Sequence, residues 1–241
     1  MAGKQYGKGI EQYELLAKND PNNPDLLREW GRLILKDTSR SEADRKQAAG
    51  AVWRKLVIAR PQDSLTATQV ADLFRQSELA DEALELYRKA VELSPESPQY
   101  REYLGEYLHT LKRKDEALAV WREMASGKKR TSENLARLAE VLSGFGYLEE
   151  GITHILEACQ LADDEFKYPL KAAELLSRAE KYDEALKQLD QAEKLSDSPE
   201  NVETVLAQRI RNLQLGDRLE AQIDLLQKEL AGAKDKAADK T

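Results

Sequence analysis

The tetrapeptide Asp-Glu-Ala-Leu recurs in this chain at a spacing that strongly limits the possible folds. It begins at Asp81, Asp115 and Asp183, so the second copy lies 34 residues after the first and the third lies 68 residues after the second. The alanine of this tetrapeptide belongs to a longer series of small residues, each 34 positions from the next: Ala49, Ala83, Ala117, Gly151 and Ala185. A period of about 20–50 residues is typical of a solenoid, in which each unit buries its apolar face only against its neighbours.

Larger apolar residues recur in the same register. Four positions after the small residues come Trp53, Tyr87, Trp121, Ile155 and Leu189, and three further on come Leu56, Ala90, Met124, Ala158 and Ala192. This spacing defines one face of a helix. A second series lies upstream and predicts a preceding helix: Val70-Ala71, Leu104-Gly105, Leu138-Ala139 and Ala172-Ala173. Each unit is therefore predicted to be a helical hairpin, with small residues where its two helices approach and acidic residues at the start of its second helix.

These positions carry a family resemblance. The segment Ser64 to Ser97 resembles a tetratricopeptide repeat (TPR), and it departs from the family pattern at Ala67, where tryptophan is frequent. The matching residues are Val70-Ala71, Phe74, Ala83, Tyr87, Ala90 and Pro95. Four consecutive units follow this register from Ser64 to about Pro199. The resemblance implies an all-α fold, a right-handed α-α superhelix of about six helical hairpins preceded by a half-repeat.

We expect a single solenoid over residues 1–231, followed by a disordered tail at 232–241. Its parts are a half-repeat at 1–23 and repeats at 24–63, 64–97, 98–131, 132–165, 166–199 and 200–231. The repeat at 24–63 has about six extra residues between Gly31 and Ala49. They are interpreted as an insertion at a hairpin tip or as a knob for a partner. In the last repeat either Leu219 or, after a two-residue insertion, Ala221 takes the alanine position.

The first residues resemble only the second half of a repeat. A lone second helix leaves an apolar face around Tyr13 and Leu16 without a covering helix. We therefore expect that the chain was cut from a longer array or that this end packs on another molecule. Homo-association through this uncapped N-terminal end is one form of such packing.

Composition excludes several classes of partner and location. The formal net charge is −7, which argues against nucleic-acid binding and against binding to an anionic membrane surface. There is no apolar run near the roughly 20 residues that a membrane span requires. The N-terminus lacks the apolar core of a secretion signal. We therefore expect a cytoplasmic protein.

The sequence gives no sign of catalysis. The two histidines, His109 and His154, fall in different repeats and are expected to point apart, so no shared metal site is predicted. The single cysteine, Cys159, excludes an internal disulfide and is expected to be a buried small apolar residue. Phosphate-binding loops, zinc-protease motifs and nucleophile elbows are absent from the sequence. We expect no enzymatic activity, no cofactor and no metal.

The resemblance points instead to a binding surface. In TPR arrays, positions two, five, nine, twelve and thirteen of each first helix line the concave face. Here position nine is acidic in four successive repeats, and the predicted partner-binding set is Asp72, Glu102, Glu106, His109, Glu140, Glu174 and Arg178. Carboxylates lined along one groove favour a partner segment rich in Lys or Arg. The alternative is local pairing, of Asp72 with Arg75 and of Glu174 with Arg178.

One known TPR subclass binds the C-terminal carboxylates of chaperones. That subclass needs a lysine and an asparagine where this chain has Glu102 and Glu106, although Lys167 and Lys171 stand where its later cations are required. Binding to chaperone tails is therefore not expected. The sequence predicts a protein-interaction scaffold that holds an extended or helical segment of a partner protein in its concave groove. The alternative is a structural spacer or self-assembly segment of a larger multidomain protein.

Overall fold

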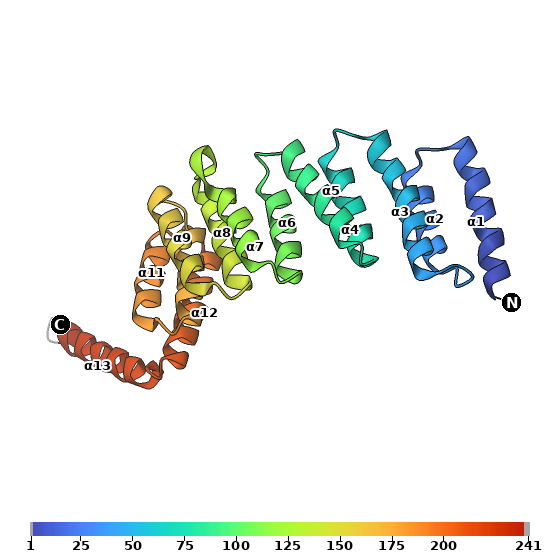
Figure 1. The fold of residues 1–241 in the computed structure, drawn as a ribbon. Helices are drawn as coiled ribbons and strands as arrows, with labels where there is room; N and C mark the ends of the chain where they lie inside the picture. The colour runs from blue at the N-terminus through green and yellow to red at the C-terminus, as the bar shows by residue number, and fades with distance from the viewer. Residues whose placement is uncertain (1, 239–241) are drawn as a thin grey trace. The chain divides into compact units, whose positions relative to one another are not determined.

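The computed structural model describes the backbone of residues 2–238 and the side chains of residues 6–228. Within residues 2–238 there are thirteen α-helices, two short 3-10 helices and no strand, so the all-α prediction is confirmed (Figure 1). The helices fall into two compact units, which are described separately: Met1–Glu123 (unit 1) and Met124–Thr241 (unit 2).

Unit 1 consists of α1 followed by three helical hairpins. Its helices are α1 (Ala2–Asn19), α2 (Pro24–Leu35), α3 (Glu42–Ala59), α4 (Ser64–Gln76), α5 (Ala80–Leu93), α6 (Pro98–Thr110) and α7 (Lys114–Arg122). The main contacts are within the pairs α2–α3, α4–α5 and α6–α7, and each pair also packs on the next. Consecutive helices therefore lie side by side, as Figure 1 shows for α4 and α5.

Unit 2 begins with two 3-10 turns, η1 (Glu123–Ala125, whose first residue closes unit 1) and η2 (Gly127–Lys129). Its helices are α8 (Ser132–Gly144), α9 (Leu148–Leu161), α10 (Lys167–Arg178), α11 (Tyr182–Lys194), α12 (Pro199–Leu215) and α13 (Leu219–Ala238). The hairpins α8–α9 and α10–α11 pack on each other through α9 and α10, and α12 packs on α11 and α10. Stacked hairpins thus form both units. The continuity of one solenoid over residues 1–231 stays a prediction.

The small residues lie where the two helices of a hairpin approach most closely. The alanines of the repeated position, Ala49, Ala83, Ala117 and Ala185, are fully buried. At the same position in α9, a Cβ on Gly151 would lie 2.8 Å from the backbone oxygen of Ala139 in α8. A methyl group therefore does not fit at Gly151 without a shift of the backbone, and the buried alanines carry no side chain larger than a methyl group at the equivalent position.

The size of the facing residue explains where glycine replaces alanine in the first helix. In the two hairpins with a buried tryptophan, the facing residue is glycine: Gly31 faces Trp53 and Gly105 faces Trp121. A Cβ on Gly105 would lie 2.1 Å from Trp121 Nε1. Where the facing residue is smaller, as with Ile155, alanine stands at the equivalent position, Ala139. Glycine is therefore required in the first helix where the facing side chain is an indole, because the indole occupies the space of the methyl group.

Four hairpins share the same turn. The residue after the C-cap of the first helix has a left-handed backbone at 34-residue intervals: Glu78, Lys112, Gly146 and Glu180, with φ between 58° and 91°. The next backbone N–H donates to the carbonyl five residues earlier, as in the bond from Lys181 N to Leu176 O (2.9 Å). This pattern is a Schellman cap, which satisfies the last carbonyls of the helix.

The repeated acidic residues follow that turn. Asp81 and Glu82 lie in the first turn of α5, where the N-cap residue, Leu79, supplies no side-chain hydrogen bond. The equivalent pairs occupy the first turns of α7 and α11. Their negative charges stabilise the exposed N–H groups at the helix start in place of a capping side chain.

The inserted residues in the first full repeat lengthen both the loop and α3. The loop at 36–41 ends at Ser41, whose hydroxyl accepts from Asp44 N and caps α3. The extra N-terminal turn of α3 carries Lys46, which bonds Glu42 at 2.8 Å and Glu78 of the α4–α5 turn at 3.1 Å. The insertion thus packs against the next hairpin of the same unit.

The last hairpin departs from the predicted register. Its left-handed turn residue is Asp217, 37 residues after Glu180, and Arg218 N donates to Leu213 O in the same cap. The equivalent of Ala185 is therefore Gln222, and the prediction of Leu219 or Ala221 at this position is wrong. The cause is α12, which has 17 residues where α10 has 12. Residues 232–238, expected within the tail, continue α13, and residues 239–241 lie outside the described range.

Candidate functional site on the first helices

The first helices of neighbouring hairpins approach one another in both units. In unit 2, Lys171 of α10 bonds Glu140 of α8 at 3.1 Å, and Asn212 of α12 donates to Ser177 Oγ of α10 at 2.6 Å. In unit 1, the charge of Asp72 in α4 acts on Glu106 in α6. The predicted binding residues therefore lie on adjacent first helices within each unit.

Asp72 is held by two partners. Its Oδ1 accepts a hydrogen bond from the Tyr87 hydroxyl and pairs with Arg75 Nη2 at 3.1 Å. The local pairing of Asp72 with Arg75 is thus present in the structure. The Asp72 side chain remains 40% exposed, so a partner segment can still reach it.

Glu106 marks the centre of an acidic cluster in unit 1, made of Asp72, Glu102 and Glu106. Burial raises the pKa of Glu106, the nearby negative charge of Glu102 raises it further, and Arg75 opposes both effects. Asp72 adds a smaller effect in the same direction, so the three carboxylates lie near enough to influence one another.

Glu102 and His109 lie beside Trp121 in unit 1. The Glu102 backbone carbonyl accepts from Trp121 Nε1 at 3.3 Å, and the His109 ring lies 5.9 Å from a Trp121 ring. Both side chains are partly exposed. His109 thus lies on the same helix as Glu102 and Glu106 of the acidic cluster.

In unit 2 the acidic residues share one cation. Lys171 Nζ lies 3.1 Å from Glu140 and 3.2 Å from Glu174. Burial acts to lower the pKa of Lys171, but its bonds to the two carboxylates outweigh that effect and raise it. The negative charges of Glu140 and Glu174, the position-nine residues of unit 2, are therefore partly neutralised.

The suggested pairing of Glu174 with Arg178 is replaced by other contacts. Glu174 bonds Lys171, and Arg178 donates from Nη2 to the Ser143 carbonyl of α8 at 3.0 Å. Ser143 lies in the last turn of α8, where backbone carbonyls have no partner within the helix. Arg178 supplies the donor that the Ser143 carbonyl lacks.

Sequence reasoning missed three residues of this face, Gln208, Arg211 and Asn212 in α12. With Glu174, Ser177, Arg178 and Leu215 they line a groove of about 380 Å³. In the observed 37-residue register Arg211 follows Glu174 at position nine, whereas a 34-residue register puts Gln208 there. The signal that reveals this, the Schellman turn at Asp217, is not evident in the sequence.

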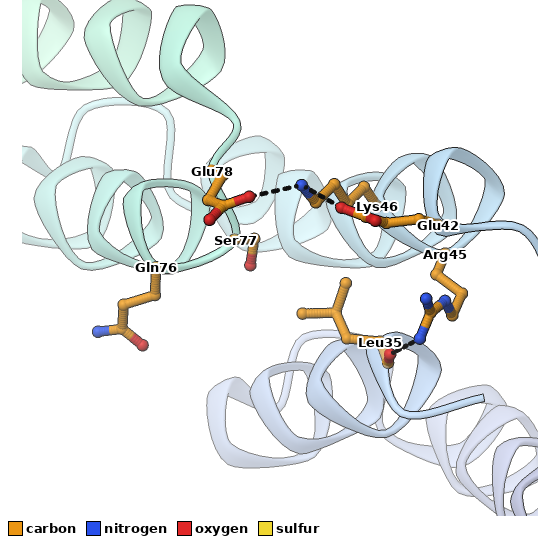
Figure 2. Close-up of a pocket in the computed structure, with 7 residues that line it drawn as sticks. All are labelled: Leu35, Glu42, Arg45, Lys46, Gln76, Ser77 and Glu78. Carbon is orange, nitrogen blue, oxygen red and sulfur yellow. Dashed lines mark hydrogen bonds and ion pairs between the residues drawn. The ribbon is translucent and has the colours of Figure 1, made fainter. Parts of the chain in front are cut away.

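A second hollow lies beside the insertion of unit 1. It has a volume of about 250 Å³, and Figure 2 shows Arg45 and Leu35 facing Ser77 and Glu78 across it. Its charged groups are engaged internally, because Lys46 bonds two carboxylates and Arg45 Nη1 donates to the Leu35 carbonyl at 2.8 Å. The contacts fit a structural role for the insertion.

The described residues hold no group of three or more His, Cys, Asp or Glu side chains that can bind a metal ion. Burial raises the pKa of the Cys159 thiol to about 11, which disfavours the thiolate at neutral pH. In the described part of the chain, every helix is too short or too polar to cross a membrane.

Comparison with known proteins agrees with the repeat pattern. Residues 70–131 match the tetratricopeptide repeat family model. No curated protein matches the chain. Similar solved structures include YrrB, described as a TPR protein with an unusual peptide-binding site (15% identity, 80% of this chain and 96% of that chain, TM-score 0.41). Others are PilF of Pseudomonas aeruginosa (18%, 92% and 93%, TM-score 0.42) and yeast Tom70 (16%, 94% and 46%, TM-score 0.44).

Proposed function

We propose that this tetratricopeptide repeat chain is a non-catalytic scaffold that binds an extended or helical segment of a partner protein on the face of its first helices. The coarse function, protein interaction, follows from the family of residues 70–131. The observation that carries the finer proposal is the arrangement of charged, partly exposed side chains on adjacent first helices. In unit 1 this face is acidic around Glu106, which supports a partner segment containing Lys or Arg.

The strength of such binding is limited by exposure. Exposed ion pairs contribute only about 0.2–1 kcal/mol each, so apolar contacts of the partner must supply the rest. We therefore expect a dissociation constant on the order of micromolar that weakens as salt screens the charges. Attraction for a basic segment should also increase as the pH rises through the raised pKa of Glu106, because the carboxylate then becomes charged.

Reversing two charges tests the acidic face. Glu106→Lys with Glu140→Lys is expected to abolish binding of Lys- or Arg-containing peptides selected on the wild-type protein from a random display library. Glu140 is 67% exposed, so the fold should persist, which circular dichroism checks. The matched control is Glu85→Lys with Glu92→Lys, which changes the charge equally on exposed positions of the second helix α5 and leaves its acidic first turn intact. Equal affinity of the selected peptides for wild type and test variant would refute the acidic face.

Self-association is the second candidate function. Leu15 and Leu16 of α1 are 53% and 52% exposed, and Val202, Leu206 and Ile210 form an exposed apolar row on α12. Apolar surface of this kind favours contact with another protein. A concentration-independent monomer in sedimentation experiments would exclude this alternative.

A further inference from the structure

The groove between α10 and α12 in unit 2 differs in charge from the acidic cluster of unit 1. Two guanidinium groups border it, from Arg178 of α10 and Arg211 of α12. Neither guanidinium group forms an ion pair with a carboxylate among residues 6–228. Arg178 donates instead to the Ser143 carbonyl, and the nearby carboxylate of Glu174 is paired with Lys171. The groove is therefore locally positive, although the whole chain carries a net charge of −7.

Two residues that line the groove carry acceptors without a donor in the described part of the chain. Asn212 is only 2% exposed; its Nδ2 donates to Ser177 Oγ, whereas its Oδ1 is buried and has no hydrogen-bond partner among residues 6–228. Gln208 Oε1 is also buried and lacks a partner in the same part of the chain. Turning the Asn212 amide over does not remove the deficit, because its other polar atom then lacks a partner. Buried polar atoms are normally satisfied, so two unsatisfied ones on residues that line the same groove are candidates for hydrogen bonds to a bound ligand.

We propose that this groove binds an extended peptide segment through one acidic side chain, Asp or Glu, held between Arg178 and Arg211, while backbone N–H groups of the segment donate to Asn212 and Gln208. A carboxylate suits guanidinium groups because it accepts their N–H donors in parallel. A peptide backbone supplies N–H donors on both sides of the acidic residue. This inference rests on the proposed function and adds the chemistry of the partner at one site.

In this proposal the acidic residue lies inside the segment, because a side-chain carboxylate leaves the backbone on both sides of it available to Asn212 and Gln208. A volume of about 380 Å³ is within the usual range for a small binding site, roughly 300–1,000 Å³, so it admits a short stretch of chain.

Peptide display with both ends of the random segment fused to carrier domains tests the proposal. The full chain is expected to enrich segments that contain Asp or Glu, and Arg178→Gln with Arg211→Gln is expected to lose that enrichment. Peptides that recognise the acidic face of unit 1 should still be recovered. Lys194→Gln with Lys228→Gln is the control, because it removes two exposed surface charges outside the groove.

Fluorescence polarisation with one selected peptide, acetylated and amidated, gives the affinity. Replacing its acidic residue by the amide is expected to weaken binding about tenfold or more, which corresponds to the loss of charge-assisted hydrogen bonds. If the enrichment persists in the arginine variant, or if binding requires a free carboxyl terminus, the acidic groove is refuted while the scaffold function stands. If the wild type enriches no peptide at all, both proposals are contradicted.

Discussion

Gly105→Ala is expected to destabilise the protein by about 3 kcal/mol, although alanine is the better helix former. The added methyl carbon would lie 2.1 Å from Nε1 of the fully buried Trp121. The indole cannot retreat, because it fills the interior of the α6–α7 hairpin and donates to the Glu102 carbonyl. Chemical denaturation of the variant measures the loss.

Two companion variants show whether the clash is the cause. Trp121→Leu should make room for the methyl group, so the double variant is expected to be more stable than the sum of the single effects by at least about 1 kcal/mol. Gly7→Ala is the control, since Gly7 lies within α1 and a Cβ there meets nothing within 4 Å. Additive effects of the two substitutions in α6 and α7 would contradict the matched glycine–tryptophan packing.

Ala117→Leu is the second large effect that we expect, a loss of about 1–3 kcal/mol from overpacking. Ala117 is completely buried at the repeated small-residue position of α7. The equivalent Gly151 shows how little space this position has, because a Cβ there already lies 2.8 Å from a backbone oxygen of the facing helix. Backbone cannot yield as a flexible side chain does.

The comparison for this prediction lies two residues further along the same helix. Ala119 is exposed, so Ala119→Leu adds the same atoms without entering the interior. Thermal unfolding should therefore show a lower melting temperature for Ala117→Leu and nearly no change for Ala119→Leu. Equal melting temperatures would mean that the 34-residue register has been assigned to the wrong face.

The hairpin fold could be predicted because the same pattern of packing residues recurs in each repeat. A small residue, a large one four positions later and an acidic pair at the helix start recur at one spacing, and all three have local physical causes in the structure. The final hairpin could not be placed, because the extra turn of α12 shifts Asp217 and Gln222 without leaving a distinctive residue pattern.

The candidate site was predictable in part. Position nine identified Glu106 and its neighbours, and the pairing of Asp72 with Arg75 follows from spacing within one helix. The bridge of Lys171 to Glu140 joins different helices, so spacing within one helix gives no indication of it. Arg211 and Asn212 were missed for the reason that displaced the last hairpin: the repeat length changes before them.

The central claim is that partner segments bind to the face of the first helices. Chemical-shift mapping of the ¹⁵N-labelled full chain, saturated with a display-selected peptide, tests it most directly. The account predicts shifts on first helices of a unit, α4 and α6 or α8, α10 and α12, together with the side-chain amides of Gln208 and Asn212 for acidic peptides. Shifts confined to the second helices α5, α9 and α11 would contradict it.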